Sequence, residues 1–323
     1  MSQSASMFYP ERFAHANLFV ADVEVSVDFY RDVCGITEVF REPGIKAGFL
    51  SNGATHHDVG LMQVSNAPLI GKDGQVQNTM TRGREPGLNH IAFRVSSEAA
   101  LIDAYRNAAR FNIKLEKALD HGMSRSLYLF DPDQNAVEFY VDTVADWRGF
   151  YADNQHQLIS AAWNPLETPP VAEFTAPDRI DTRVPAAPLQ SMEICGATLI
   201  VADMAASRMF YEKVAGLQPV EANEEGIALL SLPGTEEPCL ALVAAQQGDK
   251  IGLHSLWFLV DAGSPVLQRG EADARFHLTR TEGGTRCFVR DPNGFVLSFY
   301  PGGDALPNTP LRSEVVAPLQ AVA

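Results

Sequence analysis

Six residues that could bind a metal ion or transfer a proton lie in the first half of the chain, where the second half has less reactive residues. The comparison is internal, because residues 15–36 realign without gaps on 196–217, and 127–141 realign on 287–301. The pairs are His15 with Gly196, His57 with Pro238, His90 with Ser255, His121 with Thr281, Tyr128 with Phe288 and Glu138 with Ser298. This asymmetry indicates one active half and one structural remnant.

Two histidines and one glutamate of this set have the types and placement of a metal site. His15 and His90 lie on matching strands of two successive units, so a pseudo-twofold axis between the units would bring the imidazoles together. Glu138 lies in the apolar stretch "NAVEFYV", where a buried carboxylate needs a partner. Two imidazoles and one carboxylate form the facial triad of non-haem Fe(II) sites, which leaves coordination positions open. Mn(II) accepts the same donors, so the residue types leave the metal open.

The remaining histidines are expected to lie outside this site. His56, next to His57 in "THHDVGL", is expected to point the opposite way along a strand and to lie at the surface. His156, His254 and His277 are expected to be ordinary surface or core residues.

The elements that must position these residues repeat four times along the chain. The first unit contains a strand at "HANLFV", a helix capped by Asp22 and ended by Gly35, and three short strands. The same order begins again at Leu88, and both units recur in the second half. The sequence therefore predicts an α+β fold of four βαβββ modules in two tandem half-barrel domains. Two modules side by side would form a cup, whose concave side is suited to a ligand.

The boundaries of these parts follow from the repeat and from composition. We predict a metal-containing domain over 1–145 (modules 12–66 and 88–145), a helix and extended linker over 146–190, a degenerate domain over 191–302 and a flexible tail over 303–323. Trp147 and Trp163 indicate that the linker packs on the first half. Residues 66–86 and 146–165 could cover the mouth of the cup.

Composition limits the possible partners and location. The net charge of −15 argues against nucleic acid or an anionic membrane as a partner, because binding phosphates needs a basic surface. No apolar run approaches the roughly 18 residues of a membrane span, and the N-terminus lacks the apolar core of a secretory signal. The four cysteines have no zinc-type spacing. These features predict a cytoplasmic protein with reduced thiols.

Three motifs resemble a known family. They are H-x-x-L-x-V-x-D from His15, N-H-x-A-F around His90 and D-P-D-x-N-x-V-E-F-Y from Asp131 to Tyr140. Together they resemble the vicinal oxygen chelate (glyoxalase/bleomycin resistance/dioxygenase) superfamily, and within it the type I extradiol ring-cleavage dioxygenases. Unlike many two-domain members, this chain would carry its metal in the N-terminal half.

The resemblance implies both a reaction and roles for residues. The enzyme would open a catecholic ring by extradiol (meta) cleavage with O₂ at Fe(II), with Mn(II) as the alternative metal, held by His15, His90 and Glu138. His57 would act near bound dioxygen, and either His121 or Tyr128 would be the base that removes a catechol proton. A homo-oligomer and a part in aromatic-compound degradation are also implied. A glyoxalase-like lyase or isomerase, a hydroquinone-cleaving dioxygenase and a small-molecule binding protein remain as alternatives.

Overall fold

The computed structural model describes residues 6–74, 76–78, 82–171, 180–220, 225–269, 274–281 and 284–301. The predicted tail at 303–323 lies outside these residues, as do parts of the 66–86 segment and of the linker. The described elements confirm the predicted α+β class and its four βαβββ modules.

The first half contains two modules, each with one helix between its first and second strands. The first comprises β1 (Pro10–Val20), α1 (Val23–Asp32), β2 (Thr37–Glu42), β3 (Ala47–Ser51) and β4 (Val59–Gln63). The second comprises β7 (Gly87–Val95), α2 (Glu98–Asn107), β8 (Lys117–Asp120), β9 (Ser124–Phe130) and β10 (Ala136–Asp142). Asp22 caps α1 as predicted, because its carboxylate accepts from the Glu24 and Val25 amides. Short elements connect or extend these modules: η1 (Pro43–Ile45), β5 (Leu69–Ile70), β6 (Val76–Asn78) and η2 (Ala108–Phe111).

The second half repeats this order. Its first module comprises β12 (Ser191–Val201), α4 (Met204–Met209), η3 (Phe210–Val214), β13 (Gln218–Val220), β14 (Ile227–Ser231) and β15 (Pro238–Ala244). Its second comprises β16 (Gly252–Val260), α5 (Pro265–Arg269), β17 (His277–Thr281), β18 (Gly284–Arg290) and β19 (Val296–Pro301). The strands form two large sheets, of nine and eight strands.

Strand register confirms the internal alignment of the halves. In the first sheet β7 lies between β1 and β10, with Asn17 opposite His90 and Glu138 opposite Ala92. In the second sheet Thr198 lies opposite Ser255, and Ser298 opposite Trp257. His90 and Ser255 are therefore equivalent positions, as are Glu138 and Ser298.

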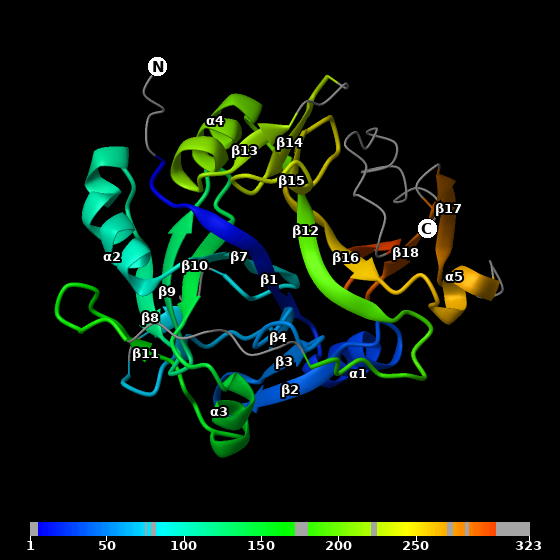
Figure 1. Cartoon of the computed structure of the whole chain (residues 1–323), viewed down its shortest axis with the longest axis horizontal. Coiled ribbons are helices and arrows are strands. Elements are labelled where there is room, and N and C mark those ends of the chain that lie inside the picture. Colours follow the sequence, from blue (N-terminus) through cyan, green and yellow to red (C-terminus); the bar gives the residue numbers. More distant parts are fainter. Residues whose placement is uncertain are drawn as a thin grey trace.

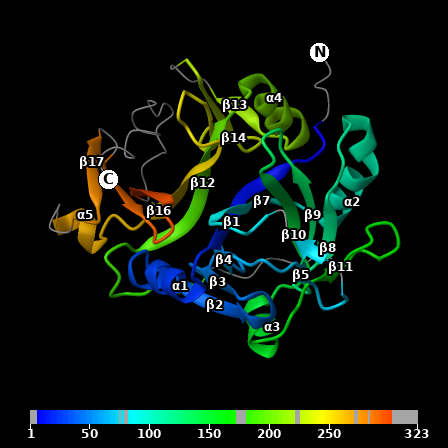
Figure 2. The same ribbon diagram turned by 180° about the vertical axis from the view of Figure 1, so that it is seen from behind.

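The first helix of each half packs on the sheet of its own half, and side chains near it reach the other half. In both views α1 lies beside β2 and β3, and α4 lies beside β13 (Figure 1, Figure 2). Tyr30 of α1 donates to Asp291 at 3.4 Å, and Tyr211 of η3 donates to Asp131 at 2.9 Å. The Ala21 amide likewise donates to Asn293 at 2.8 Å. The repeated A-D…S…F-Y and D-P motifs therefore form the interface between the halves.

The linker packs on the first half, as its tryptophans predicted. Helix α3 (Trp147–Asp153) buries Trp147 and Tyr151 against Phe40 and Met123. The short strand β11 (Ala161–Ala162) then pairs with β8 at the edge of the first sheet. Among the residues described, none of the helices has the length and apolar character needed to cross a membrane.

Candidate active site

Three neighbouring strands bring His15, His90 and Glu138 together. His15 on β1 and Glu138 on β10 both lie opposite Ala92 of β7, one on each side, and His90 is two residues from Ala92 along β7. Side chains at matching or alternate positions share one face of a sheet, so all three point into the cup. His15 Nε2 lies 2.8 Å and His90 Nε2 2.9 Å from Glu138 Oε2.

The electrostatics of this group fit a divalent cation. All three side chains are buried, and one ligand atom from each lies within 4.8 Å of the others. Burial lowers the pKa of His15 to about 4, which keeps its imidazole neutral and able to bind a metal at neutral pH. Burial by itself raises the pKa of Glu138, but the His90 and His15 imidazoles outweigh it and hold that pKa well below its usual range. A buried carboxylate needs positive charge near it, and a bound cation would supply that charge.

Further contacts orient these ligands. The Nδ1 of His90 lies 2.9 Å from Asn89 Oδ1, which leaves Nε2 directed toward Glu138. Tyr128 donates to Glu138 Oε1 at 2.8 Å and so fixes the carboxylate. Such outer contacts are the usual means of fixing the tautomer and orientation of metal ligands.

His57 lies next to the group, and its position depends on a glycine. Its ring centroid is 4.0 Å from that of His15, and its Nε2 lies 3.2 Å from Asn17 Oδ1. A Cβ at residue 60 would lie 2.2 Å from Asn17 Oδ1, so only glycine leaves room for the amide that holds His57. Burial lowers the pKa of His57 well below its ordinary value.

His121 and Tyr128 form one hydrogen-bonded pair beside the group. His121 Nε2 lies 3.1 Å from the Tyr128 hydroxyl, and His121 Nδ1 lies 2.7 Å from Ser160 Oγ in the linker. Burial lowers the pKa of His121 to about 4. Burial, reinforced by Glu138, raises the pKa of Tyr128 well above its ordinary value. Tyr128 is therefore a proton donor at neutral pH, and His121 is the neutral partner.

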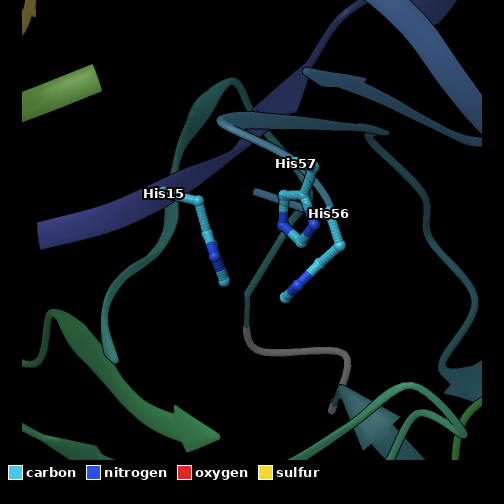
Figure 3. A group of neighbouring side chains, drawn as sticks. All are labelled: His15, His56 and His57. Carbon is cyan, nitrogen blue, oxygen red and sulfur yellow. The ribbon is translucent and has the colours of Figure 1, made fainter. Parts of the chain in front are cut away.

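His56 is not at the surface, so that prediction is wrong. Only 3% of its area is exposed, and its Nδ1 lies 2.9 Å from Asp142 Oδ1. The residue precedes β4 in a bend rather than in a regular strand, so strand alternation does not apply to it. Figure 3 shows the His56 ring grouped with those of His15 and His57.

These residues line one cavity, together with several that sequence reasoning missed. Its wall combines charged and polar side chains with apolar ones: Asn17, Arg82, Asn89, Lys117 and Ser160 on one hand, and Phe40, Ile45, Phe49, Met62, Leu69, Leu119 and Met123 on the other. Burial lowers the pKa of Lys117 to about 8, and its amine lies 4.8 Å from the centre of the Tyr128 ring. The strand register gives one signal for Lys117. It lies opposite Tyr128, whereas His277, the equivalent residue of the second half, lies opposite Phe288.

In the second half, a tryptophan fills the place that corresponds to the His15, His90 and Glu138 group of the first half. Trp257 stands where the first half has Ala92, and its Nε1 donates to Thr198 at 3.0 Å. A Cβ at Gly196, the counterpart of His15, would lie 2.6 Å from the Trp257 ring. Ile227, Leu229 and Tyr300 pack around the indole. The second cup is therefore a hydrophobic core at the place where the first has polar ligands.

Sequence comparison relates the first half to a family. Residues 12–139 match the Glyoxalase/Bleomycin resistance protein/Dioxygenase superfamily. A biphenyl-2,3-diol 1,2-dioxygenase from Rhodococcus globerulus is 31% identical over 134 residues, which are 42% of this chain and 65% of that protein. The chain thus spans less than two thirds of the length of that relative.

Structural comparison extends the likeness to both halves. The 2,3-dioxygenase LapB from Pseudomonas sp. KL28 superposes with a TM-score of 0.64 at 17% identity, over 94% of this chain and 96% of that one. A Mn(II)-bound glyoxalase from Novosphingobium aromaticivorans gives 0.63 at 14% identity, over 95% and 90%. At such identities the likeness establishes the fold. Residues 12–139 thus match the Glyoxalase/Bleomycin resistance protein/Dioxygenase superfamily, and the chain has the fold of these two enzymes.

Proposed function

We propose that the chain is an Fe(II)-dependent dioxygenase that opens a catecholic ring by extradiol (meta) cleavage with O₂. The observation that carries this proposal is the convergence of His15, His90 and Glu138 on one face of three adjacent strands. This two-histidine, one-carboxylate set is the donor set of non-haem Fe(II) oxygenases. The similarity of the first half to a biphenyl-2,3-diol dioxygenase supports the same reaction.

The metal and the protein have separate roles in this proposal. Bound Fe(II) would supply Lewis acidity toward the catechol oxygens and a path for electrons to dioxygen. His121 would accept a catechol proton, because its ring is neutral and Tyr128 stays protonated. Tyr128 would hold Glu138 in place through its single hydroxyl proton. His57, held by Asn17, would direct its other nitrogen to the space beside His15.

The cavity wall also supports a class of substrate. Apolar side chains from β2, β3, the 3₁₀ turn η1 and the linker surround the polar floor, among them Phe40, Ile45, Phe49 and Ile159. Burying an apolar group against such a wall is worth roughly 25 cal/mol per Å². We infer that the substrate is a catechol with an apolar substituent that lies against these residues.

Oxygen consumption tests the function directly. Protein purified without oxygen and loaded with Fe(II) should consume one O₂ per catechol and form a yellow ring-opened product. The panel should contain simple, alkylated, biaryl and chlorinated catechols. The His90→Gln variant should be inactive, whereas His254→Gln, which removes a buried imidazole from the second half, should keep its activity. No oxygen uptake with any catechol would refute the proposal.

A glyoxalase-like lyase or isomerase is the second candidate, because the Mn(II)-bound glyoxalase shares the fold. The two functions differ in the metal and in the need for oxygen. A protein that retains Mn, Zn or Ni when purified, and converts its substrate equally well without O₂, would be of this second kind. The cleavage of hydroquinones instead of catechols would appear in the same oxygen assay, once those substrates are added to the panel.

A further inference from the structure

Three buried imidazoles form a second group of potential ligands that overlaps the iron set. His15, His56 and His57 each offer one nitrogen, and these atoms lie within 4.8 Å of one another. The ring centroid of His57 is 4.0 Å from that of His15 and 4.6 Å from that of His56 (Figure 3). We propose that this three-imidazole set binds a divalent cation that prefers nitrogen ligands, namely Zn(II), and that Zn(II) bound there inhibits the enzyme.

Each of the three rings has one nitrogen held by an oxygen atom. Asp142 holds Nδ1 of His56 at 2.9 Å, and Asn17 holds Nε2 of His57 at 3.2 Å. Glu138 holds Nε2 of His15 at 2.8 Å. Histidines that bind metals almost always have their second nitrogen bonded to a carboxylate or carbonyl in this way. The proposed reaction does not use the Asp142–His56 contact. In the three-imidazole set, this contact would orient His56 as a metal ligand.

Two of the other nitrogens of this set lack such partners. Nδ1 of His15 and Nδ1 of His57 are buried without a hydrogen-bond partner among the described residues. A buried polar atom left unpaired costs about 1–3 kcal/mol, which a bound cation would recover.

The donor types determine which cation is favoured. Three neutral imidazoles suit Zn(II), whereas Mg(II), Ca(II) and Mn(II) favour carboxylate, carbonyl and water oxygens. Three protein ligands and one water complete the four-coordinate arrangement that Zn(II) prefers. The set that contains Glu138 supplies an oxygen ligand and remains the better site for Fe(II).

Zinc would inhibit the enzyme because the two sets of ligands share His15. Zn(II) among the three imidazoles would engage His15, a ligand of the iron set, and His57, which the proposed reaction needs near dioxygen. The inhibition therefore rests on the proposed function, whereas the binding of zinc does not.

Binding can be tested without substrate or iron. Glu138→Gln and His90→Gln each break the iron set and leave the three imidazoles intact. Metal-free protein of either variant, with the near-ultraviolet circular dichroism of the wild type, should bind one Zn(II) per chain by isothermal titration calorimetry. X-ray absorption at the zinc edge should then show three imidazole ligands.

Second substitutions assign this zinc to the three-imidazole set. In the His90→Gln background, which keeps every oxygen partner of the three imidazoles, Asp142→Asn should weaken Zn(II) binding by roughly 10- to 100-fold, because Asp142 only orients its histidine. His56→Gln should weaken it further, since it removes a ligand but can keep a hydrogen bond to Asp142. His254→Gln is the matched control and should change nothing. The proposal is overturned if neither the Glu138→Gln nor the His90→Gln protein binds Zn(II), or if His56→Gln leaves the affinity unchanged.

Discussion

Tyr211 donates a 2.9 Å hydrogen bond to Asp131, although these residues belong to opposite halves of the chain. Tyr30 makes the equivalent contact to Asp291, at 3.4 Å. Both tyrosines are buried, and both carboxylates lie at the turn before the last strand of a module. The repeated motifs thus hold the two halves of the chain together.

This pair of contacts predicts unequal costs for two matched substitutions. Tyr211→Phe should lower the free energy of unfolding by roughly 1.5–3 kcal/mol, because a buried carboxylate loses a donor. Tyr30→Phe should cost less, since its hydrogen bond is longer. Urea unfolding of both variants measures the difference. Equal stability of Tyr211→Phe and wild type would show that the contact contributes nothing.

His90 and Ser255 occupy equivalent strand positions but should respond differently to substitution. His90→Gln should abolish Fe(II) binding and ring cleavage, because it removes one of the three proposed ligands. Ser255→Ala should change neither. Iron content after dialysis, measured by mass spectrometry, and oxygen uptake give the two readouts. Retention of iron by His90→Gln would argue against the proposed set.

His121 and Tyr128 share a hydrogen bond but should contribute different steps. His121→Gln should lower kcat by about 10²- to 10⁴-fold if His121 is the base that accepts the catechol proton. Tyr128→Phe should lower kcat less and should also weaken iron binding, because Glu138 loses a donor. Steady-state kinetics with iron-loaded protein separates the two. A larger loss in kcat for Tyr128→Phe would reverse the assignment.

Trp257 should contribute to the stability of the fold but not to the affinity for the metal. Trp257→Ala removes the side chain that fills the second cup and should cost about 3–5 kcal/mol of stability. Its affinity for Fe(II) should equal that of the wild type, because the first cup is unchanged. Thermal unfolding and a metal titration of the same preparation provide the comparison. A parallel loss of iron affinity would show that the second half controls the site.

His254 should make the protein sensitive to acid. Burial, and next the nearby Arg290, lower its pKa from 6.5 to about 4. The unfolded chain therefore binds a proton between these pH values that the folded chain does not, so stability falls as the pH drops from 6.5 to about 4. The contribution is on the order of 3 kcal/mol, since each pKa unit is worth about 1.4 kcal/mol. In urea unfolding of metal-free protein at pH 7 and pH 4.5, His254→Gln should lose less stability than wild type. An unchanged difference would exclude His254 as a source of the sensitivity.

The sequence by itself determined the four modules, the alignment of the two halves and the six residues that distinguish them. This was possible because strand alternation and an internal repeat fix which side chains share a face of a sheet. His15, His90 and Glu138 follow from that rule, since they lie on regular strands.

Only the tertiary structure decided what surrounds those residues. The bend that turns His56 inward to Asp142 and the linker hydroxyl of Ser160 on His121 come from segments without regular periodicity or from distant parts of the chain. The tyrosine–aspartate contacts between halves were also not predictable, because the repeated motifs are the same whether a tyrosine meets the aspartate of its own half or of the other. Such contacts depend on how the sheets pack against each other, and the pattern of a single strand carries no information about that packing.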